Sequence, residues 1–461
     1  MSIFNSDLIP EVISSLLKDV KKSIRFVGIL GSGMYPLACI LRGRGYEVSG
    51  YDRNAKRDEY TDENGIKITR VAGNMPQNVG FCVYSLAIDE SNSEIMYAKT
   101  HDVPLISRAQ LRGALMGDYS VRISVSGTHG KSTTTALIDH ILTVAGERHT
   151  TVSGATLSSG NLYADQSGKI FIAEACEYKD SFLCLSPTCQ LITAVELDHT
   201  DYFADIDSIR ASFIKAARNA QLSIINSDDP ISSGIADELR KEGRAVLTYG
   251  KAACLDYSFD SVYTEGDTTF FTVRKGSACL RLRTSLIGEY NLYNITAAVA
   301  VADYIGIPEY KIADAISSFV TIGRRMELIS TVDGVPVYYD YAHHPTEINA
   351  VITALKARYG SVTVIFKPHT YSRTKSLWRD FIRVLCKADF TILLDIYPAR
   401  ELPIEGVDSE ALAKEIGSAQ RSDDINAAEL ARCHAHGTIV LLGAGEVDSV
   451  KDAFVNMNNK S

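Results

Sequence analysis

The stretch VRISVSGTHGKS at residues 121–132 runs from an apolar, β-branched segment through two glycines into Lys131 and Ser132, where a helical pattern begins. A nucleotide phosphate loop requires this order of strand, glycine turn and helix, because inward-turned backbone N–H groups and the helix N-terminus bind phosphate oxygens. In such a loop the Lys131 ammonium reaches the β- and γ-phosphates, and the Ser132 hydroxyl binds Mg²⁺. The loop is a variant, since Val125 stands where the general pattern has its first glycine, and a plain glycine turn is the alternative. The stretch predicts a P-loop-type domain with a mostly parallel sheet.

Length and composition place this loop in a large globular chain. The 461 residues suggest about three domains. A hydrophobic share of 46% and a charged share of 22% exclude a disordered chain. The net charge of -9 gives no general attraction to nucleic acid or anionic lipid, so phosphates must be bound by local groups. Because no apolar run is long enough for a membrane span and the N-terminal residues lack a signal-peptide pattern, we expect a cytoplasmic protein without a membrane partner.

The cysteines predict neither disulfides nor a structural metal. All nine are scattered, and none is spaced C-x-x-C. Cys433, His434 and His436 form a small cluster without a second pair of ligands, so we interpret it as a polar surface turn.

Strand-like and helical segments alternate along the whole chain, which predicts α/β domains with crossover helices. A helix is expected over 346–359. The chain divides on this pattern into 1–117, 118–322 and 323–461. The segments expected as strands are 24–30, 46–52 and 81–85 in the first part, 121–126, 169–173, 190–195 and 222–226 in the second, and 335–339, 361–366, 390–395 and 438–442 in the third.

A second glycine loop, Gly28-x-x-Gly31-x-Gly33, follows the first expected strand. Asp52, at the end of the next strand, has about the spacing of a dinucleotide-binding fingerprint. Pro36 replaces the third glycine of that fingerprint, and it suits the first turn of a helix better than close contact with a sheet. A nicotinamide or flavin site, a site for another diphosphate such as a UDP-sugar, and a plain tight turn all stay open at this point.

Polar residues follow other expected strands of the central part. Glu174 comes after 169–173, and His199 comes after 190–195. Since the carboxyl ends of parallel strands meet at one edge of a sheet, both should converge on the phosphate loop. There they could complete Mg²⁺ coordination and hold a substrate carboxylate against the γ-phosphate. For either residue alone, a solvated loop position is the alternative.

The last third is dense in charged and ring-bearing residues. Arg324 and Arg325 lie at its start, where a guanidinium could contact transferred phosphate as domains close, or could simply be solvated. The segments DYAHHP (340–345) and KPHTYSR (367–373) each follow an expected strand, where binding sites commonly lie. We expect no metal at the paired histidines, because adjacent residues rarely point at one ion without a scaffold.

Taken together, these segments resemble the Mur ligase family, and the motifs occur in family order over nearly the whole chain. The histidine-containing blocks are much more specific than a glycine loop. The motifs are GILGSGM (28–34), SGTHGKSTTT (126–135), EACEYKDSF (174–182), VELDHTDYF (195–203), NSDDP (226–230), GEYNLYN (288–294), GRRMEL (323–328), DYAHHPTEI (340–348), KPHTYSRT (367–374) and LLDIYPARE (393–401).

The resemblance implies an α/β protein of three domains. It implies a Rossmann-like domain that binds UDP-N-acetylmuramate at 1–117, a central ATP-binding domain at 118–322 and a Rossmann-like domain that brings L-alanine at 323–461. The implied activity is an ATP-dependent ligase that joins L-alanine to the lactyl carboxylate through an acyl phosphate, in peptidoglycan precursor synthesis. ATP and Mg²⁺ are the implied cofactors, nucleic acid is not a partner, and the protein is expected as a monomer or homodimer.

The resemblance also implies roles for individual residues. For ATP these are Gly127, Thr128, His129, Gly130, Lys131, Ser132, Thr133, Asn291, Asn294, Arg325 and Asp340. For catalysis they are Lys131, Glu174, His199 and Arg325, and for Mg²⁺ they are Ser132, Glu174 and His199. For the UDP-sugar they are Gly31, Ser32, Gly33, Met34, Asp52 and Ser85, and for the amino acid they are Tyr341, His344, His369 and Arg373.

The sequence departs from the family pattern at Leu30, Glu289-Tyr290 and Met326, which affects the adenine side more than the reaction class. Three other hypotheses stay open. One is a Mur-type ligase that adds a different amino acid or a recycled peptide. The second is a nicotinamide-dependent oxidoreductase that uses Gly28–Gly33, and the third is a paralogue that binds nucleotide sugar without catalysis.

Overall fold

The computed structural model describes residues 10–18, 23–73, 75–199, 202–399, 401–445 and 447–458. The chain forms two compact units. Unit 1 comprises residues 1–263, 270–284 and 293–319, and unit 2 comprises 264–269, 285–292 and 320–461. Among the described helices, none has the length and apolar character that a membrane crossing needs.

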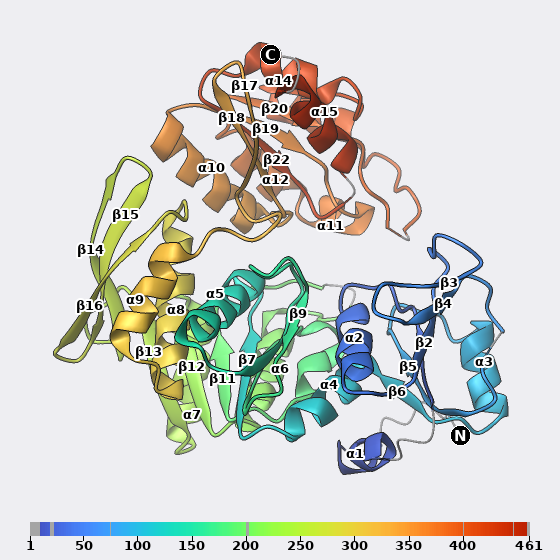
Figure 1. Ribbon diagram of the computed structural model, residues 1–461. Coiled ribbons are helices and arrows are strands. Elements are labelled where there is room, and N and C mark those ends of the chain that lie inside the picture. Colours follow the sequence, from blue (N-terminus) through green and yellow to red (C-terminus); the bar gives the residue numbers. More distant parts are fainter. Residues whose placement is uncertain are drawn as a thin grey trace. The chain divides into compact units, whose positions relative to one another are not determined.

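The first sheet, drawn in blue to cyan in Figure 1, has the strand order β3-β4-β2-β1-β5-β6. Its pairs are parallel, apart from the antiparallel pair β3–β4. The strands are β1 (Ser23–Val27), β2 (Val48–Tyr51), β3 (Glu59–Thr61), β4 (Lys67–Thr69), β5 (Val79–Tyr84) and β6 (Leu105–Ser107); the helices of this part are α1 (Pro10–Lys18), α2 (Tyr35–Gly43), α3 (Ser93–Thr100) and α4 (Arg108–Gly117).

The second sheet has the order β16-β15-β14-β13-β12-β11-β7-β10-β8-β9. Its strands are β7 (Val121–Ser126), β8 (His149–Val152), β9 (Tyr163–Asp165), β10 (Ile170–Glu174), β11 (Cys189–Ile192), β12 (Leu222–Asn226), β13 (Ala245–Gly250), β14 (Tyr257–Glu265), β15 (Thr268–Lys275) and β16 (Ala278–Thr284). The helical segments are α5 (Lys131–Ala145), the 3-10 segment η1 (Tyr178–Cys184), α6 (Ile206–Arg218), α7 (Pro230–Lys241), α8 (Glu289–Ile305) and α9 (Glu309–Ser318). Strands β10, β7, β11 and β12 are mutually parallel neighbours, so the residues that follow them meet at one edge.

The third sheet lies in unit 2 and has the order β17-β18-β22-β19-β20-β21, parallel apart from β17. Its strands are β17 (Glu327–Val332), β18 (Val335–Asp340), β19 (Val362–Phe366), β20 (Phe390–Leu393), β21 (Ala419–Arg421) and β22 (Thr438–Leu442). The helices are α10 (Pro345–Tyr359), α11 (Tyr371–Ser376), α12 (Trp378–Leu385), α13 (Ser409–Ile416), α14 (Ala427–His434) and α15 (Asp448–Asn458). Apolar side chains of these strands pack against helices in two buried clusters.

The α/β class with mostly parallel sheets is confirmed, but several strands end earlier than the sequence pattern predicts. The segment expected as 24–30 ends at Val27, because Gly28 has a left-handed φ of 83°. The expected strands 46–52, 190–195 and 390–395 end at Tyr51, Ile192 and Leu393. Apolar residues just past some strand ends, such as Ile29, are fully buried in loops, so hydrophobicity alone overestimates strand length.

Candidate functional site

The phosphate loop connects β7 to α5, as predicted, and only glycine fits at its two glycine positions. Gly127 has a φ of 135°, and a Cβ there would lie less than 3.0 Å from Thr193 Oγ1. Gly130 has a φ of 81°, and a Cβ there would lie 2.5 Å from Asn294 Oδ1. Asn294 also accepts a hydrogen bond from Thr134 Oγ1 at 3.3 Å. The loop is therefore packed against the segment after β11 and against α8, and Asn294 lies beside it.

Lys131, the first residue of α5, has its ammonium fully engaged. Nζ donates to the carbonyl oxygen of Gly127, to that of Thr128 at 3.1 Å, and to the Glu177 carboxylate at 3.2 Å. An ammonium has three N–H donors, so these partners use all of them. Burial lowers the pKa of Lys131, but the adjacent Glu177 carboxylate more than offsets this, and the pKa is raised above its ordinary value. Lys131 must therefore release a partner before it can bind a phosphate.

Ser132 and Glu174 lie together at the same sheet edge. Ser132 Oγ donates to Glu174 Oε1 at 3.1 Å, and the Gly154 N–H donates to Oε2 at 2.8 Å. Glu174 is the last residue of β10 and pairs in register with Val125 of β7. Two oxygens that bind adjacent positions of one Mg²⁺ are about 3 Å apart, given Mg–O distances of about 2.1 Å. The hydroxyl and the carboxylate thus fit the donor set predicted for Mg²⁺.

His199 lies next to Glu177, a residue that the sequence analysis did not single out. Nε2 of His199 is 3.9 Å from Glu177 Oε1, and the His199 ring is 4.7 Å from the Tyr178 ring. His199 has a left-handed φ of 52°. The Glu177 side chain is 1% exposed, so a buried carboxylate bridges Lys131 and His199. Its signal in the sequence is a second glutamate three residues after Glu174.

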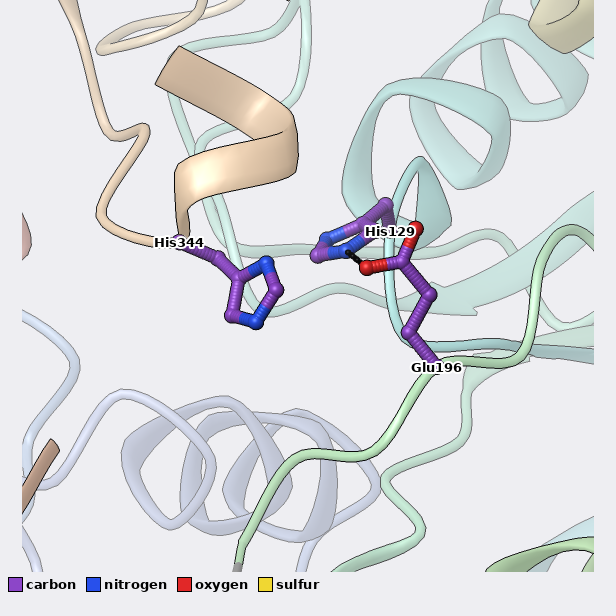
Figure 2. Close-up of side chains that lie close together, drawn as sticks. All are labelled: His129, Glu196 and His344. Carbon is purple, nitrogen blue, oxygen red and sulfur yellow. Dashed lines mark hydrogen bonds and ion pairs between the residues drawn. The ribbon is translucent and has the colours of Figure 1, made fainter. Parts of the chain in front are cut away.

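The loops after β7 and β11 are joined by polar contacts. His129 Nε2 lies 3.4 Å from Glu196 Oε2, as Figure 2 shows. The Glu196 N–H donates to Thr128 Oγ1 at 2.9 Å, and the Thr128 N–H donates to the Ala194 carbonyl at 2.7 Å. These contacts fix the backbone of the predicted phosphate loop from one side. His344, also drawn in Figure 2, lies at the start of α10 and belongs to unit 2.

In the first sheet, Asp52 holds the second glycine loop. Its carboxylate accepts the N–H groups of Leu30 at 2.9 Å and of Asn54 at 3.0 Å. Met34, predicted to contact the nucleotide sugar, has its side chain in the core at 1% exposure. Its N–H donates to the Gly31 carbonyl at 2.8 Å, and its carbonyl accepts the Ala38 N–H at 3.1 Å. Ser85 Oγ accepts the Ala87 N–H at 3.3 Å at the end of β5.

Helix α4 brings two arginines that the sequence analysis missed. A Cβ on Gly33 would lie less than 3.0 Å from Arg108 Nη1, so this guanidinium lies over the glycine loop. Arg112 is buried, and its Nη1 donates to the Glu174 carbonyl at 2.6 Å. Burial lowers the pKa of Arg112 to about 10. Arg112 therefore links the first sheet to the strand end that carries Glu174.

In unit 2, Asp340 ends β18 and accepts two backbone N–H groups. These come from Met326 and Ala342, both at 2.8 Å. Burial raises the pKa of Asp340 to about 6, against the opposing effect of Arg325. The Arg325 guanidinium lies 5.1 Å from the centre of the Tyr341 ring. Asp340, Arg325 and Tyr341 thus form one local cluster.

His344 and Asn291 have local structural partners in unit 2. His344 is buried and caps α10, because its Nδ1 accepts the Thr346 N–H at 3.4 Å. Asn291, near the start of α8, donates from Nδ2 to the Ile287 carbonyl at 2.9 Å.

The predicted amino-acid contacts His369 and Arg373 are neighbours. Arg373 Nη1 lies 3.3 Å from His369 Nδ1. The His369 ring stacks on Tyr397 with centroids 5.6 Å apart, and the His343 ring lies 6.1 Å away. In the sequence, Tyr397 lies in the LLDIYPARE motif without a predicted role of its own.

Comparison with known proteins identifies the class. Residues 23–120 match the Mur ligase family catalytic domain, 125–302 the Mur ligase middle domain, and 324–445 the Mur ligase glutamate ligase domain. The chain is 38% identical to a UDP-N-acetylmuramate–L-alanine ligase of Agathobacter rectalis over 400 residues, which are 84% of this chain and 86% of that protein. It belongs to the Mur ligase family and is an enzyme of the ligase class.

Solved structures show the same fold. A UDP-N-acetylmuramate–alanine ligase from Thermotoga maritima superposes with a TM-score of 0.77 at 23% identity, covering 95% of this chain and 99% of that one. A murein peptide ligase from Psychrobacter arcticus gives a TM-score of 0.70 at 22% identity, with the same coverage of 95% and 99%. The family assignment replaces the oxidoreductase hypothesis for Gly28–Gly33.

Proposed function

We propose that this ligase uses ATP to join L-alanine to the lactyl carboxylate of UDP-N-acetylmuramate in peptidoglycan precursor synthesis. The observation that carries the proposal is the cluster of Lys131, Ser132 and Glu174 at one sheet edge, which suits a polyphosphate and a divalent cation. The name of the Agathobacter relative supports the choice of substrates. The three-domain division at 1–117, 118–322 and 323–461, with one substrate each, is part of the proposal, as is a cytoplasmic location where ATP is available.

In the proposed reaction the lactyl carboxylate attacks the γ-phosphate of ATP, which gives an acyl phosphate and ADP. The amine of alanine then attacks the acyl carbon, and phosphate leaves as the amide forms. Such chemistry requires mainly charge neutralisation and alignment. Lys131 would leave a loop carbonyl to bind the phosphates, while the backbone N–H groups of residues 129–133 bind the remaining oxygens.

Ser132 and Glu174 would hold Mg²⁺, which when bound neutralises charge on the phosphate oxygens. His199, beside Glu177, would contact the reacting carboxylate or a second cation. Asn294 would contact the nucleotide, and Asn291, Arg325 and Asp340 remain predicted nucleotide contacts.

The first sheet would bind the nucleotide sugar through the backbone of Gly31–Met34. Asp52 would act by holding this loop, and Ser85 lies at the adjacent strand end. Unit 2 would bind alanine, with the carboxylate on the Arg373 guanidinium and with Tyr341, His344 and His369 bordering the site.

The test is phosphate and ADP release with each of the three substrates omitted in turn. We expect turnover only with all three, and loss of nearly all of it in Lys131→Ala. Mass spectrometry of products from a mixture of amino acids decides the acceptor. A dominant product without alanine would refute the substrate, and undiminished activity in Lys131→Ala would refute the phosphate-loop assignment.

A second candidate is a Mur-type ligase that adds another amino acid or a recycled peptide. The fold similarity to the murein peptide ligase keeps it open, and a peptide added to the same mixture tests it.

A further inference from the structure

We propose that Tyr397 positions the amino-acid site, by fixing His369 and through it Arg373. This inference rests on the proposed function, because it takes His369 and Arg373 as the residues that bind the amino acid. Tyr397 follows β20, and His369 follows the neighbouring strand β19.

The backbone of Tyr397 forms hydrogen bonds with the residues before and after His369. The Tyr397 N–H donates to the Pro368 carbonyl at 2.9 Å, and the Thr370 N–H donates to the Tyr397 carbonyl at 3.0 Å. Residues 369 and 397 are paired as an isolated parallel bridge. Thr370 has a left-handed φ of 65°, which is uncommon for a β-branched residue and persists only where its surroundings enforce it. The two hydrogen bonds supply that restraint.

The ring of Tyr397 acts on the side chain of His369. The two rings stack at 5.6 Å with an angle of 20° between their planes. On the other side, Arg373 Nη1 lies 3.3 Å from His369 Nδ1. The contacts run from Tyr397 through His369 to Arg373. Removing the tyrosine ring therefore takes away the surface on which the imidazole stacks, and we expect the direction of the guanidinium to change with it.

A third loop packs closely against Tyr397. A Cβ on Gly445, after β22, would lie 2.9 Å from both Cβ and Cγ of Tyr397. Strands β22, β19 and β20 are adjacent in the sheet, so three neighbouring loops meet at this ring. Gly445 allows the contact because it has no side chain.

A carboxylate is bound well by a guanidinium only when the planar fork is aligned with both oxygens. A displacement of about 1 Å can lower the rate about a hundredfold in an aligned site. Disturbing Tyr397 should therefore weaken the use of the amino acid and leave the other two substrates unaffected.

The experiment is steady-state kinetics of Tyr397→Ala, Tyr397→Phe and Gly445→Ala, with each substrate varied while the other two are saturating. We expect Tyr397→Ala to raise KM for alanine about tenfold or more. Its KM for ATP and for the nucleotide sugar should stay within about twofold of wild type. Tyr397→Phe keeps the stacked ring and should behave like wild type.

Gly445→Ala supplies an independent perturbation of the same contact. It should raise KM for alanine in the wild-type background and have a smaller effect in Tyr397→Ala, where the ring is absent, so that the two changes are not additive. An unchanged KM for alanine in Tyr397→Ala, or equal losses for all three substrates together with a lower Tm, would overturn the proposal. Wild-type turnover that does not depend on alanine would instead refute the proposed function. The kinetics would then be repeated with the amino acid that the enzyme accepts.

Discussion

The buried pair of Lys131 and Glu177 makes a prediction about nucleotide affinity. Both carboxylate oxygens of Glu177 lie 3.2 Å from Nζ of Lys131, and the Glu177 side chain is 1% exposed. At this separation and an effective dielectric constant of about 20, the attraction is about 5 kcal/mol, and much of it is offset by desolvation. Removing one member of such a pair typically costs about 3 to 5 kcal/mol, because the other charge stays buried without a partner.

Phosphate can supply the counter-charge that Glu177 supplies in the free enzyme. In Glu177→Gln the free enzyme loses this counter-charge and the stability that it supplies. The nucleotide complex loses less stability, because phosphate still neutralises Lys131. We therefore expect a lower free energy of unfolding without nucleotide and tighter binding of ADP than in wild type. If about 1.4 kcal/mol of the loss is recovered on binding, Kd for ADP falls about tenfold.

The assay is calorimetric titration with ADP and denaturant unfolding with and without ADP. Both are done first in EDTA, so that metal binding does not contribute, and then with Mg²⁺. Glu242→Gln serves as the control, since Glu242 pairs with Arg218 on the surface. Equal or weaker ADP binding by Glu177→Gln in EDTA would show that Glu177 does not compete with phosphate for Lys131.

Two further changes test α5 and the phosphate loop that precedes it. His149 is fully buried, with Nε2 2.9 Å from Asp139 Oδ1; burial lowers its pKa, but the bond to Asp139 outweighs this and the pKa is raised. This stabilisation is complete below the unfolded-state pKa of about 6.5 and is lost as pH rises through the folded-state pKa. The difference in unfolding free energy between wild type and His149→Gln should therefore shrink as pH is raised from about 6.5. Gly130→Ala should lower kcat/KM for ATP, because its φ of 81° costs a side chain about 1 to 2 kcal/mol and the Cβ would lie 2.5 Å from Asn294 Oδ1. Gly43→Ala, with no atom near its Cβ, is the matched control and should leave kcat/KM unchanged.

The phosphate loop could be predicted because each of its requirements is local. Glycines at 127 and 130, Lys131 and Ser132 lie within six residues between a strand and a helix. The contact between Ser132 and Glu174 follows from one more rule, that parallel strands end at the same edge. The ten-stranded sheet was less predictable, since β14 to β16 carry many exposed residues and little hydrophobic signal.

Glu177 and Arg112 could not be predicted because their positions depend on packing. The segment after Glu177 includes left-handed residues at Lys179 and Asp180, which no local pattern indicates. Arg112 reaches Glu174 only because α4 lies close to η1, where a Cβ on Gly113 would lie less than 3.0 Å from the Cys184 carbonyl oxygen. Sequence periodicity indicates which face of α4 is apolar, but it does not indicate which strand end that helix meets.

Several residues predicted as ligand contacts also hold loop backbones. The carboxylates of Asp52 and Asp340 each accept two backbone N–H groups, and His344 caps a helix. A polar residue just after a strand has two uses, since the loop there has unpaired N–H groups and also borders the ligand. Both uses produce the same sequence pattern. Substituting Asp52 should therefore change the shape of the glycine loop first, and substrate affinity as a consequence of that shape.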